Sequence, residues 1–251
     1  MSEHTPAAEG GPEPSRAARR PSRRGLLLTG AGLVVGAGGA EAANLVGQHD
    51  RTPPRRPPAP GEDLMTEHGV LKRLLLAYQA ASDQLAAGRT PPAGAITDAA
   101  QLIADFIEGF HEGLEEAYIF PRVPAEHHEL VQTLLVQHDR GRHLTTAISL
   151  AAGAQLSEAA VRRALQRYLN LFIRMYAAHE AWEDTVIFPV IQQVTPQRTL
   201  DQLAERFAEL QSAHYGDHAL TQLLQRVSGI EQQLGIADLN AFTPPLIYRP
   251  S

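Results

Sequence analysis

Residues 111–121 read HEGLEEAYIFP and residues 179–189 read HEAWEDTVIFP. The two stretches align without gaps, and six of the eleven positions are identical. Both begin with a His, carry a Glu four residues later and end in Ile-Phe-Pro. A His and a Glu at this spacing lie one turn apart on the same face of an α-helix. The chain therefore contains one helical element twice.

The sequence around these stretches follows the same helical period. From residue 63 onward, apolar side chains recur every three or four positions, without the alternation typical of strands. Pro121 and Pro189 are expected to end the second and fourth helices, because a proline ring clashes with the preceding turn. The predicted helices span residues 63–87, 95–120, 126–152, 158–188 and 199–234. This pattern predicts an all-α protein, with an up-down-up-down four-helix bundle in residues 62–190 and an extra helix and tail in residues 191–251.

The repeat extends to a second pair of histidines. His68 and His138 are separated by nearly the same offset as the two stretches, and each lies on the helix that precedes one of them. Two helical hairpins of this design would turn six polar side chains inward, those of His68, His111, Glu115, His138, His179 and Glu183. Burying them without partners costs several kcal/mol for each group. Cations between them would remove that cost, and a carboxylate can bridge two ions, so the sequence predicts a dinuclear metal centre.

Composition limits the ligand chemistry of this centre. The chain has 11 His and no Cys, which excludes disulfides, iron–sulfur clusters and thiolate metal sites. Imidazole and carboxylate ligands without sulfur suit Fe and Mn, and Zn is possible. A single His on an apolar helix face is more often a hydrogen-bonded core residue. Four inward His and two Glu in a repeat are hard to explain in that way.

The chain resembles hemerythrin-like HHE cation-binding domains in this set of residues and in both Ile-Phe-Pro endings. The resemblance covers about residues 62–190. It implies a four-helix bundle with two non-haem iron ions that bind O₂ reversibly, bridged by Glu115 and Glu183. By the same resemblance, one iron would be bound by His68 and His111, and the other by His138 and His179.

The chain departs from oxygen-carrying members of that family on the third helix, where Arg142 occupies the place of a second His. His143 lies five residues after His138, about 140° away around the helix, and is a poor substitute. One metal ion is therefore short of a protein ligand. Glu112, a water molecule or a substrate are the candidates for the open position.

Three further features bear on the extent of the metal site. On the fourth helix the oxygen carriers use an Asp at the position of Asp184, whereas the internal repeat favours Glu183. His214 and His218 have metal-ligand spacing without a carboxylate cluster, so we expect a solvated helix face there. Trp182 lies beside the expected ligands and is predicted to pack in the core.

The N-terminal quarter, residues 1–62, differs in composition from the rest of the chain. The sequence SRR at residues 22–24, an apolar Gly-rich run and AEA at residues 40–42 resemble a twin-arginine signal with its cleavage site. The alternative is a disordered basic tail before a weak helix. We expect residues 1–42 to direct export through the twin-arginine translocase, with a membrane contact only through an uncleaved signal. Residues 43–61, rich in Pro, are expected to form a stiff linker.

The charge and the motifs together limit the number of possible functions. Residues 63–251 carry 14 basic and 22 acidic side chains, which argues against nucleic acid as a partner. The leading hypothesis is an exported di-iron protein that binds O₂ or another small diatomic for storage, delivery or sensing, since no separate catalytic constellation is visible. The alternative is a di-iron enzyme that oxidises Fe(II) or consumes peroxide or NO at the open position. A third hypothesis is a bundle in which metal only stabilises the fold.

Overall fold

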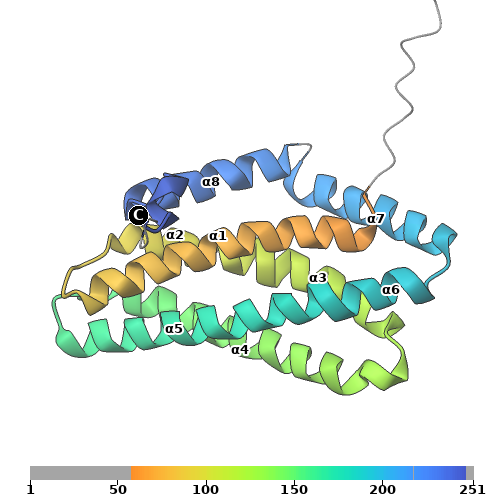
Figure 1. Ribbon diagram of the computed structural model, residues 1–251, viewed down its shortest axis with the longest axis horizontal. Helices are drawn as coiled ribbons and strands as arrows, with labels where there is room; N and C mark the ends of the chain where they lie inside the picture. Colours follow the sequence, from red (N-terminus) through yellow and green to blue (C-terminus); the bar gives the residue numbers. More distant parts are fainter. Residues whose placement is uncertain (1–57, 217, 247–251) are drawn as a thin grey trace, which may run out of the picture. The chain divides into compact units, whose positions relative to one another are not determined.

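A computed structural model describes residues 58–216 and 218–246 of the chain. The predicted signal segment and most of the predicted linker lie outside these ranges. Every regular element of the described part is a helix (Figure 1), which confirms the all-α prediction. Within the same ranges, no helix combines the length and the apolar character that a membrane span requires.

Four helical rods form a bundle in which successive rods reverse direction (Figure 1). The first rod is α1 (Pro60–Ala86). The second runs through α2 (Ala93–Leu102), η2 (Ile103–His111), α3 (Glu112–Leu114), η3 (Glu115–Ile119) and η4 (Phe120–Arg122). The third consists of η5 (Ala125–His127) and α4 (His128–Gly153). The fourth consists of α5 (Ala159–Trp182), η6 (Glu183–Ile187) and α6 (Phe188–Val194).

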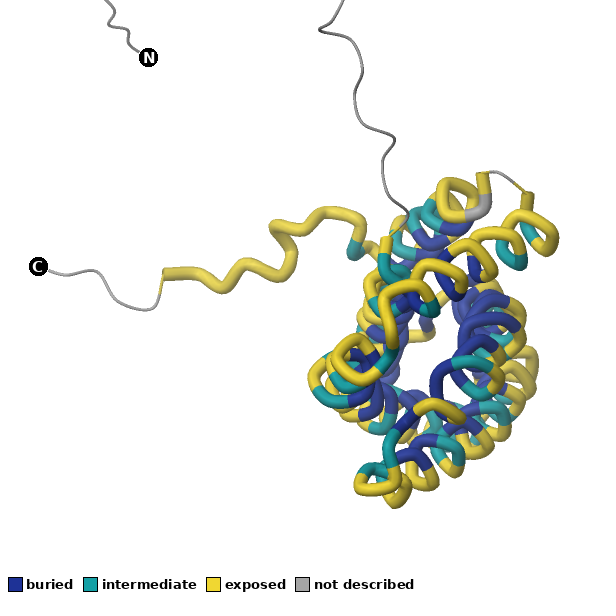
Figure 2. Tube along the Cα trace, turned by 90° about the vertical axis from the view of Figure 1, so that its right-hand side faces the viewer, coloured by how far each residue is buried: buried dark blue, intermediate teal, exposed yellow. Residues whose placement is uncertain are grey.

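The rods close into a ring around a shared core. α1 packs against α5, α5 against α4, and α4 against α2. Figure 2 shows the buried residues turned toward the middle of this ring and the exposed residues outside it. Large side chains fill the core, among them Tyr78, whose ring meets that of Phe172 edge-on with centroids 5.4 Å apart. The polar side chains of the predicted centre therefore share an interior that is mostly apolar.

Three segments of the second and fourth rods are π-helical, with hydrogen bonds that span five residues. η3 begins at Glu115 and η6 begins at Glu183, which are equivalent positions of the internal repeat. π-Helical turns are rare and are frequently found at functional sites. The structure therefore repeats the backbone distortion together with the sequence.

The fourth rod is longer than predicted. The expectation that Pro189 ends it is wrong, because α6 continues the helix to Val194. The amide of Phe188 bonds to the carbonyl of Glu183, five residues earlier, so Pro189 follows a widened turn. Such a turn accommodates a proline that would clash inside a regular α-helix.

The C-terminal region forms two helices in place of the single predicted one. They are α7 (Gln197–Tyr215) and α8 (Ala219–Leu234), and a short turn, η7 (Leu239–Phe242), follows. Gly216 ends α7 with a φ of 79°, a conformation that favours glycine. Both helices lie outside the ring, α7 against α1 and α8 against α1 and α2 (Figure 1). Arg73 of α1 fixes α8 through two bonds to Glu231, at 2.8 and 2.6 Å.

Candidate metal centre

All six predicted ligands come together inside the bundle. They lie on all four rods: His68 on α1, His111 in η2, Glu115 in η3, His138 on α4, His179 on α5 and Glu183 in η6. None of them is more than 3% exposed. The sequence repeat thus produces one buried cluster built from both halves of the domain.

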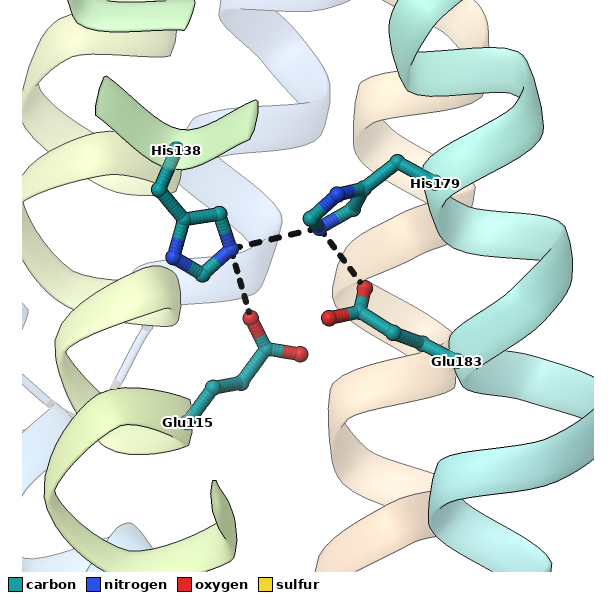
Figure 3. A group of neighbouring side chains, drawn as sticks. All are labelled: Glu115, His138, His179 and Glu183. Atoms are coloured by element: carbon teal, nitrogen blue, oxygen red, sulfur yellow. Dashed lines mark hydrogen bonds and ion pairs between the residues drawn. The ribbon is translucent and has the colours of Figure 1, made fainter. Parts of the chain in front are cut away.

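Each of the two glutamates contacts one histidine from each half. Glu115 places Oε1 3.4 Å from His111 Nε2 and Oε2 3.5 Å from His138 Nε2. Glu183 places Oε2 3.5 Å from His68 Nε2 and 3.0 Å from His179 Nε2. Figure 3 shows two of these contacts, Glu115 with His138 and Glu183 with His179. The carboxylates therefore lie between the two histidine pairs.

The imidazoles form two close pairs. The ring centroids of His68 and His111 are 4.8 Å apart, and those of His138 and His179 are 4.9 Å apart. In the second pair, the two Nε2 atoms lie only 3.2 Å from each other (Figure 3). Both pairs therefore turn nitrogen atoms inward, toward the glutamates.

A carboxylate holds the outer nitrogen of one histidine in each pair. Nδ1 of His68 lies 2.7 Å from Asp184 Oδ1, and Nδ1 of His138 lies 3.0 Å from Glu116 Oε1. A carboxylate oxygen can only accept here, so Nδ1 carries a hydrogen, and Nε2 is the nitrogen whose lone pair faces the centre once the ring has lost its second proton. Asp184 is thus placed behind His68, whereas Glu183 faces the interior.

The outer partners of the other two histidines differ from each other, since one is a carboxylate and the other is an amide. Nδ1 of His111 lies 2.8 Å from Glu67 Oε2, and Nδ1 of His179 lies 3.0 Å from Gln137 Oε1. All four Nε2 atoms are therefore oriented toward the glutamates by hydrogen bonds at Nδ1. This is the arrangement in which protein histidines bind metals.

The charges of the cluster shift its pKa values strongly. Burial alone would lower the pKa of His68, but the hydrogen bond to Asp184 and the nearby carboxylate of Glu183 raise it to about 9. Burial likewise opposes a raised pKa at His138, which reaches about 9 through Glu115 and other nearby carboxylates. Burial favours protonated Glu115, but the charge of His111 keeps its pKa well below the ordinary value. Without a metal ion, the cluster is held together by imidazolium–carboxylate attraction.

Arg142, which stands in the place of a further His, neutralises two carboxylates. Its Nη2 lies 2.7 Å from Glu112 Oε2 and 2.7 Å from Glu116 Oε1. Glu112 also accepts a hydrogen bond of 2.8 Å from the Tyr176 hydroxyl. Its nearest approach to His138 is 4.0 Å from Nδ1, the nitrogen that points away from the centre. The structure thus places Glu112 behind the histidines, in contact with Arg142 and Tyr176.

The other half of the repeat contains a matching arrangement. Lys72 lies four residues after His68, as Arg142 lies four residues after His138. Its Nζ is 3.1 Å from Glu180 Oε2 and 3.1 Å from Asp184 Oδ2. Lys72 and Glu180 were not among the residues predicted from the sequence, although the offset of the repeat pairs Lys72 with Arg142 and Glu180 with Glu112.

Other candidate residues lie away from the cluster. His214 and His218 are exposed, and so is His143, which is consistent with the weaker interpretations of these residues. Trp182 was expected in the core, but its side chain is 55% exposed. It occupies the helix position before Glu183, which faces inward, so Trp182 itself points away from the bundle.

The donor atoms of the cluster fit metal ions. In the described residues, neither oxygen of Glu115 or Glu183 has a hydrogen-bond partner, although both side chains are fully buried. Buried carboxylate oxygens without donors are costly unless a cation compensates them. Among the described residues, three groups have donor atoms within 4.8 Å of one another. They are Glu115, His138, His179 and Glu183; His68, His111 and Glu115; and, on the outer side of His138, Glu112, Glu116 and His138.

The comparisons with known proteins agree with this geometry. The sequence model of the hemerythrin HHE cation binding domain matches residues 59–157 and 130–243, two ranges that start about one repeat apart. The uncharacterized proteins Rv1995 of Mycobacterium tuberculosis and Mb2018 of Mycobacterium bovis are each 38% identical over 202 residues, 79% of this chain and 79% of theirs. No solved structure matches the chain significantly. Since the matched ranges include all four rods and the buried cluster able to hold metal, the chain belongs to the hemerythrin HHE cation-binding domain family.

Proposed function

We propose that the protein is a non-haem di-iron protein that binds O₂ or another small diatomic such as NO, for storage, delivery or sensing. One observation carries the proposal: each fully buried glutamate contacts one imidazole of each histidine pair. Such a contact pattern suits two cations that share both carboxylates. A single ion would leave one pair of histidines without a role.

The six residues divide naturally between two ions. His68 and His111 would hold one, His138 and His179 the other, and Glu115 and Glu183 would bridge them. Nitrogen and oxygen donors without sulfur suit iron, and Mn or Zn remain compatible. When iron is bound, the centre supplies reversible binding of a diatomic molecule.

The protein surroundings of the centre favour a small apolar ligand. Phe188 stacks on His68 with ring centroids 5.5 Å apart, and Phe120 stacks on His138 at 5.7 Å. Both phenylalanines come from the Ile-Phe-Pro endings of the repeat and are no more than 5% exposed. They cover the cluster on two sides and exclude water from it, as reversible binding of O₂ requires.

Export belongs to the same proposal. The SRR sequence, apolar run and AEA sequence within residues 1–42 support transport by the twin-arginine translocase. This system carries folded proteins, so it would allow the metal to be inserted before export.

A second candidate function is supported by Tyr176. Its buried hydroxyl donates a hydrogen bond to Glu112, which lies directly behind the ligands. Glu112 also contacts Arg142, whose side chain is 41% exposed and so links Glu112 to the surface. Consumption of peroxide or NO takes up and redistributes protons, which reversible O₂ binding does not require. Oxidation of Fe(II) at the same centre belongs to this alternative.

The test is metal analysis followed by an O₂ titration of the optical spectrum. We expect about two iron ions per chain and a charge-transfer absorption that appears with O₂ and disappears under vacuum. Glu115→Ala should abolish both, whereas His214→Ala, which removes an exposed His outside the cluster, should change neither.

The outcomes separate the hypotheses. Iron-loaded protein without a reversible spectrum contradicts O₂ binding. Steady-state consumption of hydrogen peroxide, NO or Fe(II) far beyond the amount of protein favours the enzyme. If metal only raises thermal stability and neither result is seen, the ion has a structural role.

A further inference from the structure

The two halves of the cluster differ at one outer position. The four outer partners of the histidines come from equivalent positions of the repeat, and three of them are carboxylates. The exception is Gln137, which occupies the position of Glu67 in the other half. Both residues directly precede a ligand histidine, and both reach across to the histidine of the neighbouring rod.

The difference is one of charge at almost identical geometry. Glu67 Oε2 lies 2.8 Å from His111 Nδ1, and Gln137 Oε1 lies 3.0 Å from His179 Nδ1. A carboxylate acceptor polarises the imidazole and makes its other nitrogen a stronger metal ligand, whereas an amide oxygen does so weakly. The Glu67 side chain is only 3% exposed, so solvent does not screen this effect.

The remaining outer partners do not cancel the difference. His68 and His138 are each bonded to a carboxylate, Asp184 and Glu116. Each of these carboxylates also binds a cation, Lys72 at 3.1 Å and Arg142 at 2.7 Å. The two halves are therefore matched at these positions, and among the four outer partners Glu67 is the unmatched negative charge.

Helix α7 supports Glu67 from outside the four-rod bundle. Gln211 Nε2 lies 3.4 Å from Glu67 Oε1, the oxygen that does not face His111. The nearby contacts of α7 are apolar, with Phe207 edge-on to Tyr118 at 5.6 Å. The C-terminal extension thus covers the side of the bundle where Glu67 lies and contributes a donor to it.

We propose that the half-site of His68 and His111 binds its metal ion more tightly than the half-site of His138 and His179, and therefore fills first. Glu67 is the positioning residue that sets the difference, and Gln211 holds it in place. The inference rests on the proposed binding of two ions by the six ligands. It adds an order of filling that the chemical types of the ligands, which are the same in the two halves, do not provide.

The experiment measures the two affinities with Zn²⁺ as the probe. Competition with a chromophoric chelator at fixed pH gives the affinities of the full chain. Histidine ¹⁵N NMR at one equivalent of Zn²⁺ shows which imidazoles bind first. We expect two classes of site, with His68 and His111 responding before His138 and His179.

Two reciprocal substitutions test the cause. Glu67→Gln should weaken the tight class by about 10- to 100-fold, the usual effect of losing an outer carboxylate. Gln137→Glu should strengthen the weak class, and the double variant should reverse the order of filling. Gln211→Ala should weaken the tight class by less than Glu67→Gln does. Glu205→Gln, the same charge change on an exposed residue of α7, serves as the matched control.

Each result decides a separate point. Two ions bound with equal affinity, or His138 and His179 responding first, would overturn the inference and leave the dinuclear centre intact. Failure to bind two ions at these histidines would overturn the proposed function and the inference with it. If Glu67→Gln does not fold, as judged by circular dichroism, Gln137→Glu alone decides whether the outer charge sets the affinity.

Discussion

Tyr176 occupies the space that a side chain at position 141 would need. A Cβ built on Gly141 would overlap the Tyr176 hydroxyl and the adjacent ring carbon. Gly141 is buried on α4, one turn after His138 and next to Arg142. The absence of a side chain there lets Tyr176 reach Glu112 from the neighbouring rod.

Gly141→Ala should therefore lower the stability of the protein. Overpacking of a close contact costs about 1–3 kcal/mol, more than the gain in helix propensity of up to about 1 kcal/mol. Urea unfolding of the metal-free protein measures the change. Gly229→Ala on α8 is the matched control, because a Cβ there meets nothing within 4 Å. Equal or higher stability of Gly141→Ala would show that Tyr176 can move away without cost.

Helices α7 and α8 extend the bundle on the side of the first two rods. They are amphipathic, and their apolar faces pack on α1 and α2 through buried residues such as Phe207 and Val227. Tyr215 adds a hydrogen bond of 2.8 Å from its hydroxyl to the carbonyl of Asp105. These elements therefore belong to the same core as the four rods.

Phe207→Ala tests whether α7 contributes to the stability of that core. The side chain is 1% exposed, and truncating a buried Phe costs about 3–5 kcal/mol. We expect a lower midpoint of urea unfolding, measured by circular dichroism. Leu239→Ala removes a side chain that is 81% exposed and should change the midpoint little. Unchanged stability of Phe207→Ala would mean that α7 contributes little to the folding free energy.

For the whole molecule, charge makes the stability of the metal-free protein depend on pH. The pKa values of His68 and His138 are raised to about 9 in the folded protein, from an ordinary value of 6.5. Such a group stabilises the fold fully below its unfolded pKa and loses its contribution as the pH rises through the folded value. We expect the free energy of unfolding to fall between pH 6.5 and pH 9, by roughly 3 kcal/mol for each imidazole.

Urea unfolding in the presence of a chelator measures this profile. Metal-loaded protein should not lose stability over the same range, because metal binding needs neutral imidazoles and strengthens as the pH rises. His138→Ala should flatten part of the profile, whereas His143→Ala removes a side chain that is 71% exposed and should leave it unchanged. A metal-free profile that is flat or rises with pH contradicts the electrostatic explanation.

Local sequence was enough to predict the helical class, the repeat and the residues from which the cluster is built. Helical periodicity is a local property, and the stretches that begin at His111 and His179 carry it within their own length. The local pattern gave two wrong predictions. It ended the fourth rod at Pro189, where a π-helical turn allows the helix to continue, and it placed the exposed Trp182 in the core.

The partners behind the ligands depend on tertiary packing and could not be predicted in the same way. Glu67 and Gln211 are 144 residues apart, and His68 and Asp184 are 116 residues apart, so neither contact follows from local spacing. These pairings depend on the way the rods pack and on the position of α7, which residues far apart in the chain determine together. Periodicity fixes which face of a helix is buried, whereas packing against other helices fixes what that face meets.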